Sequence, residues 1–229
     1  MVPSDLPDHL CRLRFFVPGH EMEMCGHATV GTLWAMRQWG LWTTARARVQ
    51  TLSGSVEVEW DDVRNRAWVS QPAVTISTLT KENWRAIASV LRLDSSPAEL
   101  DVVNASTSRV KTLVRLNSVA ALDALTPDFA AMRALCEAID STGIYPYAVT
   151  EVGAFARQFP KASGYPEDAA TGIAAAALWG HLNQTGIVRG GGVYTVRQGV
   201  AMRSPSMIQL RPRAEGAGCW LSGDTQWLT

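Results

Sequence analysis

The segments EMEMCGHATVGTLWAM (21–36) and GYPEDAATGIAAAALWGHL (164–182) decide the fold of this chain. In each, a polar loop leads into a run that is apolar on nearly every face, which indicates a buried helix rather than a surface helix. We expect these helices over residues 28–39 and 171–182. A buried helix must be covered by other elements, so each segment predicts one lobe of an α+β protein.

Strand-like segments flank both predicted helices. Residues 46–52, 55–60 and 66–71 alternate polar and apolar side chains between turn residues, which predicts an antiparallel meander. Further strands are expected at 10–17, 110–116, 144–150, 154–159, 193–197, 207–211 and 219–222, and further helices at 81–91, 119–125 and 127–140. Thr80 is the expected cap of the helix at 81–91, and Pro127 the expected first residue of the last one.

The order of these elements predicts two pseudo-symmetric lobes, each a curved, mostly antiparallel sheet wrapped around a central apolar helix. Residues 1–98 would form the N-terminal lobe, joined by the last strand at 217–229, and residues 99–216 the C-terminal lobe. The two helix starts would then face a shared cleft.

Composition narrows the function classes. The 229 residues include 21 basic and 21 acidic side chains, so the charge balance gives no sign of binding to nucleic acid or to an anionic membrane. No stretch approaches the roughly 20 apolar residues of a membrane span, and we expect a cytoplasmic protein. The four cysteines are far apart in the sequence, which predicts neither a metal site nor a disulfide framework.

Cys25 stands at the start of the first buried helix, where the partial positive charge of the helix end favours a thiolate that can act as a base or acid. An inert buried cysteine is the competing interpretation. Gly26 allows a ligand to approach the backbone closely. His27 titrates in the range needed for proton transfer, although a single histidine can equally serve as a structural hydrogen-bonding group.

Asp168 precedes the second buried helix. By itself the pattern Asp-Ala-Ala-Thr-Gly describes an ordinary helix cap with Thr171 in the first turn. The helix is too apolar to lie on the surface, however, and a partly desolvated carboxylate at its start is suited to general acid/base chemistry. The backbone N–H groups of Ala170, Thr171 and Gly172 are expected to be free to bind a substrate carboxylate.

Three motifs occur in one order along the chain: Phe16-x-Pro18-x-x-Glu21 before Cys25-Gly-His-Ala-Thr-Val-Gly31, then Glu167-Asp-Ala-Ala-Thr-Gly172, then Gln198-Gly-x-x-Met-Arg-Ser-Pro-Ser206. They resemble the phenazine-biosynthesis PhzF family of isomerases, which are relatives of diaminopimelate epimerase. The resemblance implies the two-lobed diaminopimelate epimerase-like fold with its site in the cleft between the lobes, no cofactor or metal, and a homodimer.

Carried onto this sequence, the resemblance implies that Cys25, His27 and Asp168 are catalytic. It also implies that the residues around the two helix starts bind the substrate, namely Gly26, Ala28, Thr29, Ala170, Thr171, Gly172 and Ile173. Two positions depart from the family pattern, because Ala169 replaces a proline and Ile173 replaces a serine that lines the site.

The family's catalytic base is a glutamate in an Asn-x-Ser-Glu-Thr segment, which would lie upstream of the first residue of this chain. The start of the sequence is then misassigned or shortened, or the protein is a non-catalytic binding paralogue, or proton transfer depends on Cys25, Asp168 and His27. We favour the third interpretation.

The sequence therefore predicts a cofactor-independent isomerase. It would move a proton or double bond on a small cyclic, amino-acid-like carboxylate in secondary-metabolite (antibiotic) biosynthesis. A non-catalytic binding or partner protein, and a hydrolase or lyase that uses the same cleft, are the alternatives.

Overall fold

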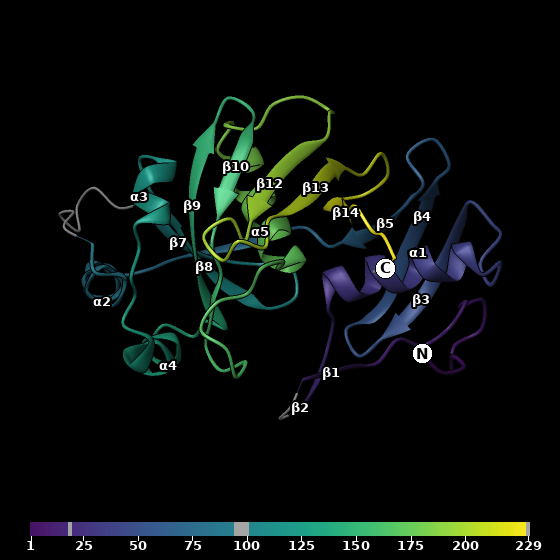
Figure 1. Ribbon diagram of the computed structural model, residues 1–229, viewed down its shortest axis with the longest axis horizontal. Helices are drawn as coiled ribbons and strands as arrows, with labels where there is room; N and C mark the ends of the chain where they lie inside the picture. The colour runs from purple at the N-terminus through teal and green to yellow at the C-terminus, as the bar shows by residue number, and fades with distance from the viewer. Residues whose placement is uncertain (18–19, 94–100, 228–229) are drawn as a thin grey trace.

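The computed structural model describes residues 1–17, 20–93 and 101–227, and it contains two central helices beside a long curved sheet (Figure 1). The helices are α1 (Gly26–Gln38), α2 (Lys81–Leu91), α3 (Val119–Asp123), α4 (Phe129–Ala138) and α5 (Gly172–Gln184). The strands are β1 (Phe15–Val17), β2 (His20–Met22), β3 (Arg46–Thr51), β4 (Gly54–Asp61), β5 (Arg66–Gln71), β6 (Thr75–Thr78), β7 (Val102–Ser106), β8 (Val110–Arg115), β9 (Gly143–Thr150), β10 (Gly153–Ala156), β11 (Phe159–Pro160), β12 (Tyr194–Gln198), β13 (Ser206–Pro212) and β14 (Cys219–Gly223). None of the described helices is long and apolar enough to cross a membrane.

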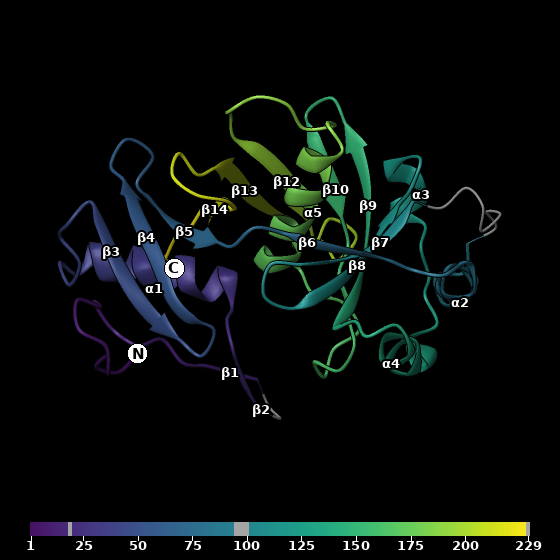
Figure 2. The ribbon, with the colours of Figure 1, turned by 180° about the vertical axis from the view of Figure 1, so that it is seen from behind.

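One continuous sheet connects both parts of the molecule. Its strand order is β3-β4-β5-β14-β13-β12-β10-β9-β8-β7-β6, with β11 added beside β9, and its parallel pairs are β8 with β9 and β10 with β12. The junction is β14, which pairs antiparallel with β5 on one side and with β13 on the other. Helices α1 and α5 lie on separate parts of this sheet (Figures 1 and 2). The prediction of an α+β protein with a mostly antiparallel sheet around central helices is confirmed.

Three hydrophobic clusters hold the elements in place. In the first, Val30 and Leu33 of α1 pack with residues of β3, β4 and β5 such as Val58. In the second, the four alanines 174–177 and Leu178 of α5 pack against strands of the C-terminal half. The small alanine side chains permit the sheet backbone to approach the helix closely. The third cluster joins α2 and α4 and was not predicted.

Several element boundaries differ from the predictions. The strand expected at 10–17 is regular only in β1, and Leu10 and Leu13 instead donate backbone hydrogen bonds to β3. The strand expected at 154–159 is interrupted, because the carbonyl of Gln158 accepts a hydrogen bond from Asp168 N–H. Helix α4 begins at Phe129 rather than Pro127, since the side chain of Asp128 caps it. Strands β2, β6 and β7 were not predicted.

The lobe boundary expected at residue 98 lies outside the described residues, as does Pro18 of the first motif. Strand β6 pairs with β7, and α2 belongs to the hydrophobic cluster of α4. We therefore propose that the C-terminal lobe begins near residue 73, and that β14 joins the N-terminal lobe through its pairing with β5.

Candidate active site

The starts of α1 and α5 meet through two glycines. A Cβ atom built on Gly26 would lie 3.2 Å from Gly172 Cα and 2.9 Å from Leu221 Cδ2, and one built on Gly172 would lie 2.6 Å from Leu221 Cδ2. These separations are shorter than ordinary van der Waals contacts, so the two helix ends approach this closely only without side chains. The positive ends of both helices therefore face the same region.

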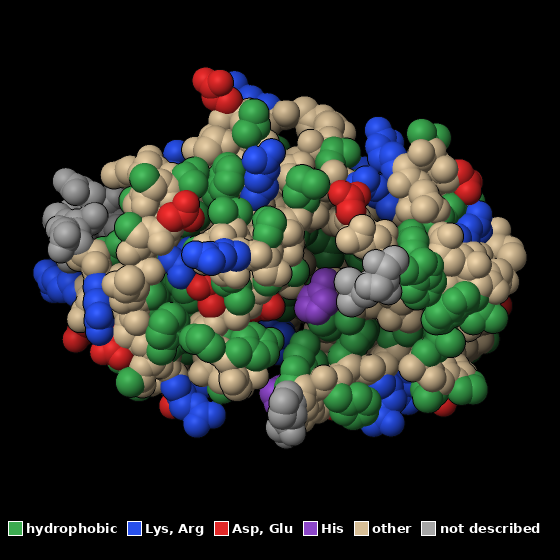
Figure 3. All heavy atoms as spheres, in the orientation of Figure 1, with side chains coloured by type: hydrophobic (Ala, Val, Ile, Leu, Met, Phe, Trp, Pro, Cys, Tyr) green, Lys and Arg blue, Asp and Glu red, His purple; other side chains and the backbone are tan. Residues whose placement is uncertain are grey.

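A cleft of about 380 Å³ lies at these helix starts, and the surface is visibly hollowed near the middle of the molecule (Figure 3). Nine of the ten predicted site residues line it: Cys25, Gly26, His27, Ala28, Asp168, Ala170, Thr171, Gly172 and Ile173. The structure thus brings together two segments that are more than a hundred residues apart in the sequence.

Thr29 is the predicted site residue that does not line the cleft. Its side chain is fully buried, and its hydroxyl donates a hydrogen bond of 2.7 Å to the carbonyl of Cys25 on the inner face of α1. Thr29 therefore lies away from the cleft, because at this position the helix turns the side chain toward the core.

Cys25 and His27 form a contact pair at the start of α1. The Sγ atom of Cys25 lies 3.6 Å from Nε2 and 3.7 Å from Nδ1 of His27. Nδ1 is also 2.8 Å from the carbonyl oxygen of Ala170, which can only accept, so Nδ1 carries a proton and donates it to this bond. His27 therefore ties the first helix start to the loop before the second.

The same contacts set the charge of the imidazole. The hydrogen bond to Cys25 raises the pKa of His27 to about 9, with further support from the Ala170 carbonyl and Asp168, while burial acts in the opposite direction. At neutral pH the ring is protonated and faces the cleft as a proton donor.

Asp168 lies three residues before the helix cap position rather than at it. Helix α5 begins at Gly172 with Thr171 at the N-cap, and the Thr171 hydroxyl donates a hydrogen bond of 2.5 Å to the carboxylate of Asp168. The simple cap interpretation of Asp168 is therefore wrong. The bond fixes one carboxylate oxygen while the side chain lines the cleft.

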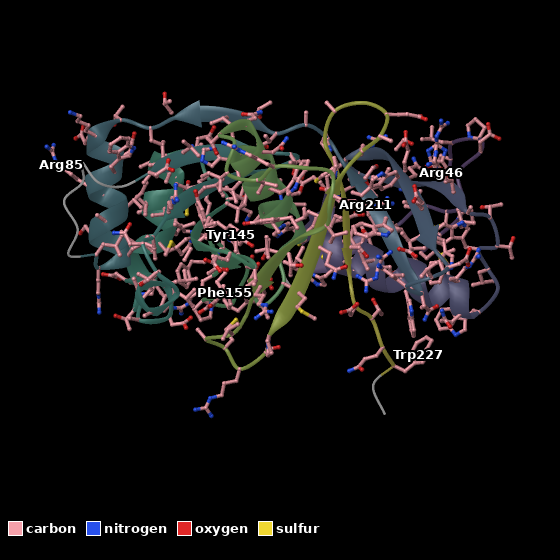
Figure 4. The ribbon with its side chains drawn as sticks, turned by 90° about the horizontal axis from the view of Figure 1, so that it is seen from above. Arg46, Arg85, Tyr145, Phe155, Arg211 and Trp227 are labelled. Carbon is pink, nitrogen blue, oxygen red and sulfur yellow. The ribbon has the colours of Figure 1, made fainter. Side chains whose placement is uncertain are left out.

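The side chain of Gln198 holds the loop that carries Asp168 in place. The sequence analysis quoted Gln198 as part of a motif but gave it no such role. Its fully buried amide donates to the Asp168 carbonyl at 2.7 Å and accepts from Thr171 N–H at 3.2 Å. It also accepts from the hydroxyl of Tyr145, which is labelled inside the α5 lobe in Figure 4. Because Gln198 occupies the N–H of Thr171, the prediction that this group is free for a ligand was wrong.

Arg157 fixes the loop from its other end. Its guanidinium makes two hydrogen bonds, of 2.9 and 2.7 Å, to Glu167 and a further bond of 2.8 Å to the carbonyl of Leu125. Arg157 and Glu167 are both nearly buried, so this ion pair holds the residue directly before Asp168.

Lys111 and Gln158 also line the cleft and were missed in the sequence. The signal for Lys111 was present, because strand alternation puts it on the same face of β8 as the core residue Leu113. Gln158 gave no signal, since its position depends on the interruption between β10 and β11. Among the described residues, no group of three or more His, Cys, Asp or Glu side chains is arranged to hold a metal ion.

Comparison with known proteins gives concordant results. A family model described as phenazine biosynthesis-like protein matches residues 2–218. The chain is 30% identical over 223 residues to an uncharacterized isomerase of Deinococcus radiodurans, covering 92% of this chain and 72% of that protein. It is 34% identical over 211 residues to the trans-2,3-dihydro-3-hydroxyanthranilate isomerase of Pseudomonas aeruginosa, covering 90% and 71%.

A solved structure of a predicted epimerase from Pseudomonas aeruginosa matches with a TM-score of 0.77 and 20% identity, covering 96% of this chain and 77% of that one. At this identity the likeness concerns the fold alone. It agrees with the two central helices and the curved sheet described above.

Proposed function

Because the chain belongs to the phenazine biosynthesis-like family of isomerases, we propose that it moves a proton on a small cyclic, amino-acid-like carboxylate. The observation that carries this proposal is the presence of Cys25, His27 and Asp168 in one cleft at the meeting point of two helix starts. A proton donor and a carboxylate in one cleft are the parts that an isomerase of this kind needs.

The helix starts provide the place for the substrate carboxylate. Each helix end carries roughly half a positive charge, and the N–H groups of Ala170 and Gly172 remain for an anion after Gln198 has engaged Thr171. The protonated ring of His27 adds a full positive charge beside them. A carboxylate bound there leaves the ring of the substrate inside the cleft.

The proposed reaction uses Asp168 as the base and His27 as the acid. Asp168 removes a proton from a ring carbon, the electrons of the broken C–H bond shift the neighbouring double bond, and His27 gives its proton to the far end of the conjugated system. Asp168 ends protonated and His27 neutral, and exchange with water restores both. Cys25 keeps His27 charged before the transfer. Only protons move, so we propose that no cofactor takes part.

The direction of transfer follows from the protonation of His27. An imidazolium cannot act as a base until it has lost its proton, whereas the carboxylate of Asp168 is oriented by Thr171 toward the same space. The reverse assignment would require His27 to be neutral at the start of each turnover.

A solvent-exchange experiment tests the proposal. Purified protein is incubated in deuterated water with trans-2,3-dihydro-3-hydroxyanthranilate, the compound named for the Pseudomonas relative, and with related cyclic amino acids. We expect one deuterium in the product, and a loss of about 10²–10⁴-fold in rate for Asp168→Asn. Asp123→Asn, which changes an exposed carboxylate away from the cleft, is the matched control and should be unaffected.

Absence of deuterium from every product would refute the proton-transfer mechanism. Unchanged pathway output in both Asp168→Asn and Cys25→Ser would favour a non-catalytic binding protein, and a cleaved product would favour a hydrolase or lyase. From the similarity to the hydroxyanthranilate isomerase we further propose a role in secondary-metabolite (antibiotic) biosynthesis, a cytoplasmic location and a homodimer.

A further inference from the structure

Lys111 is a buried cation in the cleft that the proposed mechanism does not use. It is 3% exposed, it belongs to β8, and it shares the α5-facing side of that strand with Leu113. None of the hydrogen bonds or ion pairs among the described parts of the chain involves its ammonium group, although the residue lines the cleft. A buried ammonium that makes no ion pair is unfavourable: the carboxylate of Asp168 acts on Lys111 only through space, and the nearby start of α5 adds positive charge.

Gln158 is a second unsatisfied polar group in the same cleft. It is 1% exposed, and within the described ranges neither its amide nitrogen nor its amide oxygen has a hydrogen-bond partner. Buried amides almost always find partners, so both atoms of this amide are left for a water or a ligand group to satisfy. Its backbone is held in place by the hydrogen bond from Asp168 N–H to its carbonyl.

We propose that Lys111 and Gln158 form a second polar subsite in the cleft, which binds an anionic oxygen group of the substrate in addition to the carboxylate held at the helix starts. Lys111 neutralises the charge of this group, and the Gln158 amide donates to one of its oxygens. The inference rests on the proposed function and names its substrate class, a ring that carries a carboxylate and a second oxygen function which is anionic or becomes anionic during proton transfer.

The protonation of Lys111 makes the subsite detectable. Burial, with repulsion from Arg109, lowers the pKa of Lys111 to about 7, and Asp168 and Cys136 act in the opposite direction. An anion beside the amine favours its protonated form, so binding at pH 8 should take up a proton. His27, with its pKa of about 9, is already protonated at that pH. The remaining titratable groups that line the cleft are the N-terminal amine of Met1, Arg14, Cys25 and Tyr165.

Calorimetric titration with benzoate and with phthalate, isophthalate and terephthalate tests the subsite. The three dicarboxylates offer a second anion at three spacings, while benzoate can occupy only the helix starts. We expect at least one dicarboxylate to bind about 10-fold more tightly than benzoate, and its binding at pH 8 to take up protons in a comparison of phosphate and Tris buffers.

Two variants assign the effect. Lys111→Met and Gln158→Leu keep the side-chain size and should remove the preference for the dicarboxylate while benzoate still binds as in the wild type. Only Lys111→Met should abolish proton uptake. Lys81→Met changes an exposed lysine at the start of α2 and serves as the control that retains both effects. Circular dichroism verifies the fold of each variant.

A wild-type protein that binds no dicarboxylate more tightly than benzoate, or that binds none of the four compounds, would overturn the inference. So would a Lys111→Met variant that keeps the preference or that weakens all four compounds equally. The proposed function fails by a different result, the absence of solvent deuterium from any product. A protein that fails that test can still bind a dicarboxylate more tightly than benzoate, so the two tests are independent.

Discussion

The glycine pair at the helix starts leads to a quantitative prediction. Gly26→Ala places a methyl group 3.2 Å from Gly172 Cα and 2.9 Å from Leu221 Cδ2, so the two helices must move apart. Overpacking of this kind costs about 1–3 kcal/mol. Gly31→Ala, in the middle of α1, meets nothing within 4 Å, and alanine should there stabilise the helix by about 0.5–1 kcal/mol.

The free energies of unfolding of the two variants should therefore differ by about 1.5–4 kcal/mol, with wild type between them. In urea, an m-value of about 2–3 kcal/mol/M converts this difference into midpoints separated by about 1 M. Gly26→Ala should also lower kcat/KM, since it displaces both helix ends from the substrate, whereas Gly31→Ala should not. Equal midpoints for the two variants would refute the argument that close approach requires glycine at position 26.

Leu221→Ala separates the two contacts. This change removes the Cδ2 atom that lies 2.6 Å from a Cβ on Gly172, after which the nearest remaining backbone contact of Gly172→Ala is an ordinary 3.4 Å. For Gly26→Ala the 3.2 Å contact with the backbone remains. In the Leu221→Ala background, Gly172→Ala should become nearly neutral while Gly26→Ala still destabilises. Identical rescue of both would show that Leu221 alone determines the spacing.

Three further predictions concern the residues around the cleft. In NMR titrations the His27 ring should titrate near pH 9 in the wild type and at a lower pH in Cys25→Ala; a midpoint that does not move would exclude Cys25 as the main cause. Because the pKa of His27 is raised in the folded state, its protonation stabilises the fold fully below about pH 6.5, and this contribution is lost as the pH rises through about 9. The unfolding free energy should therefore fall between these pH values in the wild type, and it should fall much less in Cys25→Ala. Arg157→Met should cost about 3–5 kcal/mol in urea denaturation, since it leaves the Glu167 carboxylate buried without its partner, and a loss below 1 kcal/mol would contradict this. Gln198→Leu should lower kcat more than Gly31→Ala does, since it frees the loop that carries Asp168, and activity equal to wild type would remove Gln198 from the site.

Local sequence patterns correctly predicted the helices and strands that are fixed by interactions between residues close together in the sequence. Thr80 caps α2 as predicted, with Asn83 returning the hydrogen bond, because capping depends on residues three apart. The meander of β3, β4 and β5 follows from alternation and turn residues in the same way. Short strands such as β6 and β7 were missed because their pairing partners, rather than their own composition, hold them in the sheet.

Nine of the ten proposed site residues line one cleft. Most of them were found because helix starts can be recognised without knowledge of the tertiary contacts, whereas Ala28 and Ile173 were proposed only from the family resemblance. Thr29 was proposed as well, although its direction depends on which face of α1 meets the core, and Thr171 N–H was expected to be free where Gln198 occupies it. Lys111 and Gln158 became part of the cleft only through the packing of β8 and the break after β10.

The sequence by itself determined that there are two buried helices with a cysteine–histidine pair at the start of one and an aspartate before the other. Only the tertiary structure decided that Gly26 lies against Gly172 and that the Cys25–His27 pair reaches the loop of Asp168. The physical reason is the distance along the sequence between the residues that interact. Helix formation and capping depend on neighbours within a few residues, whereas the charge of His27 and the shape of the cleft depend on groups that long-range packing brings together.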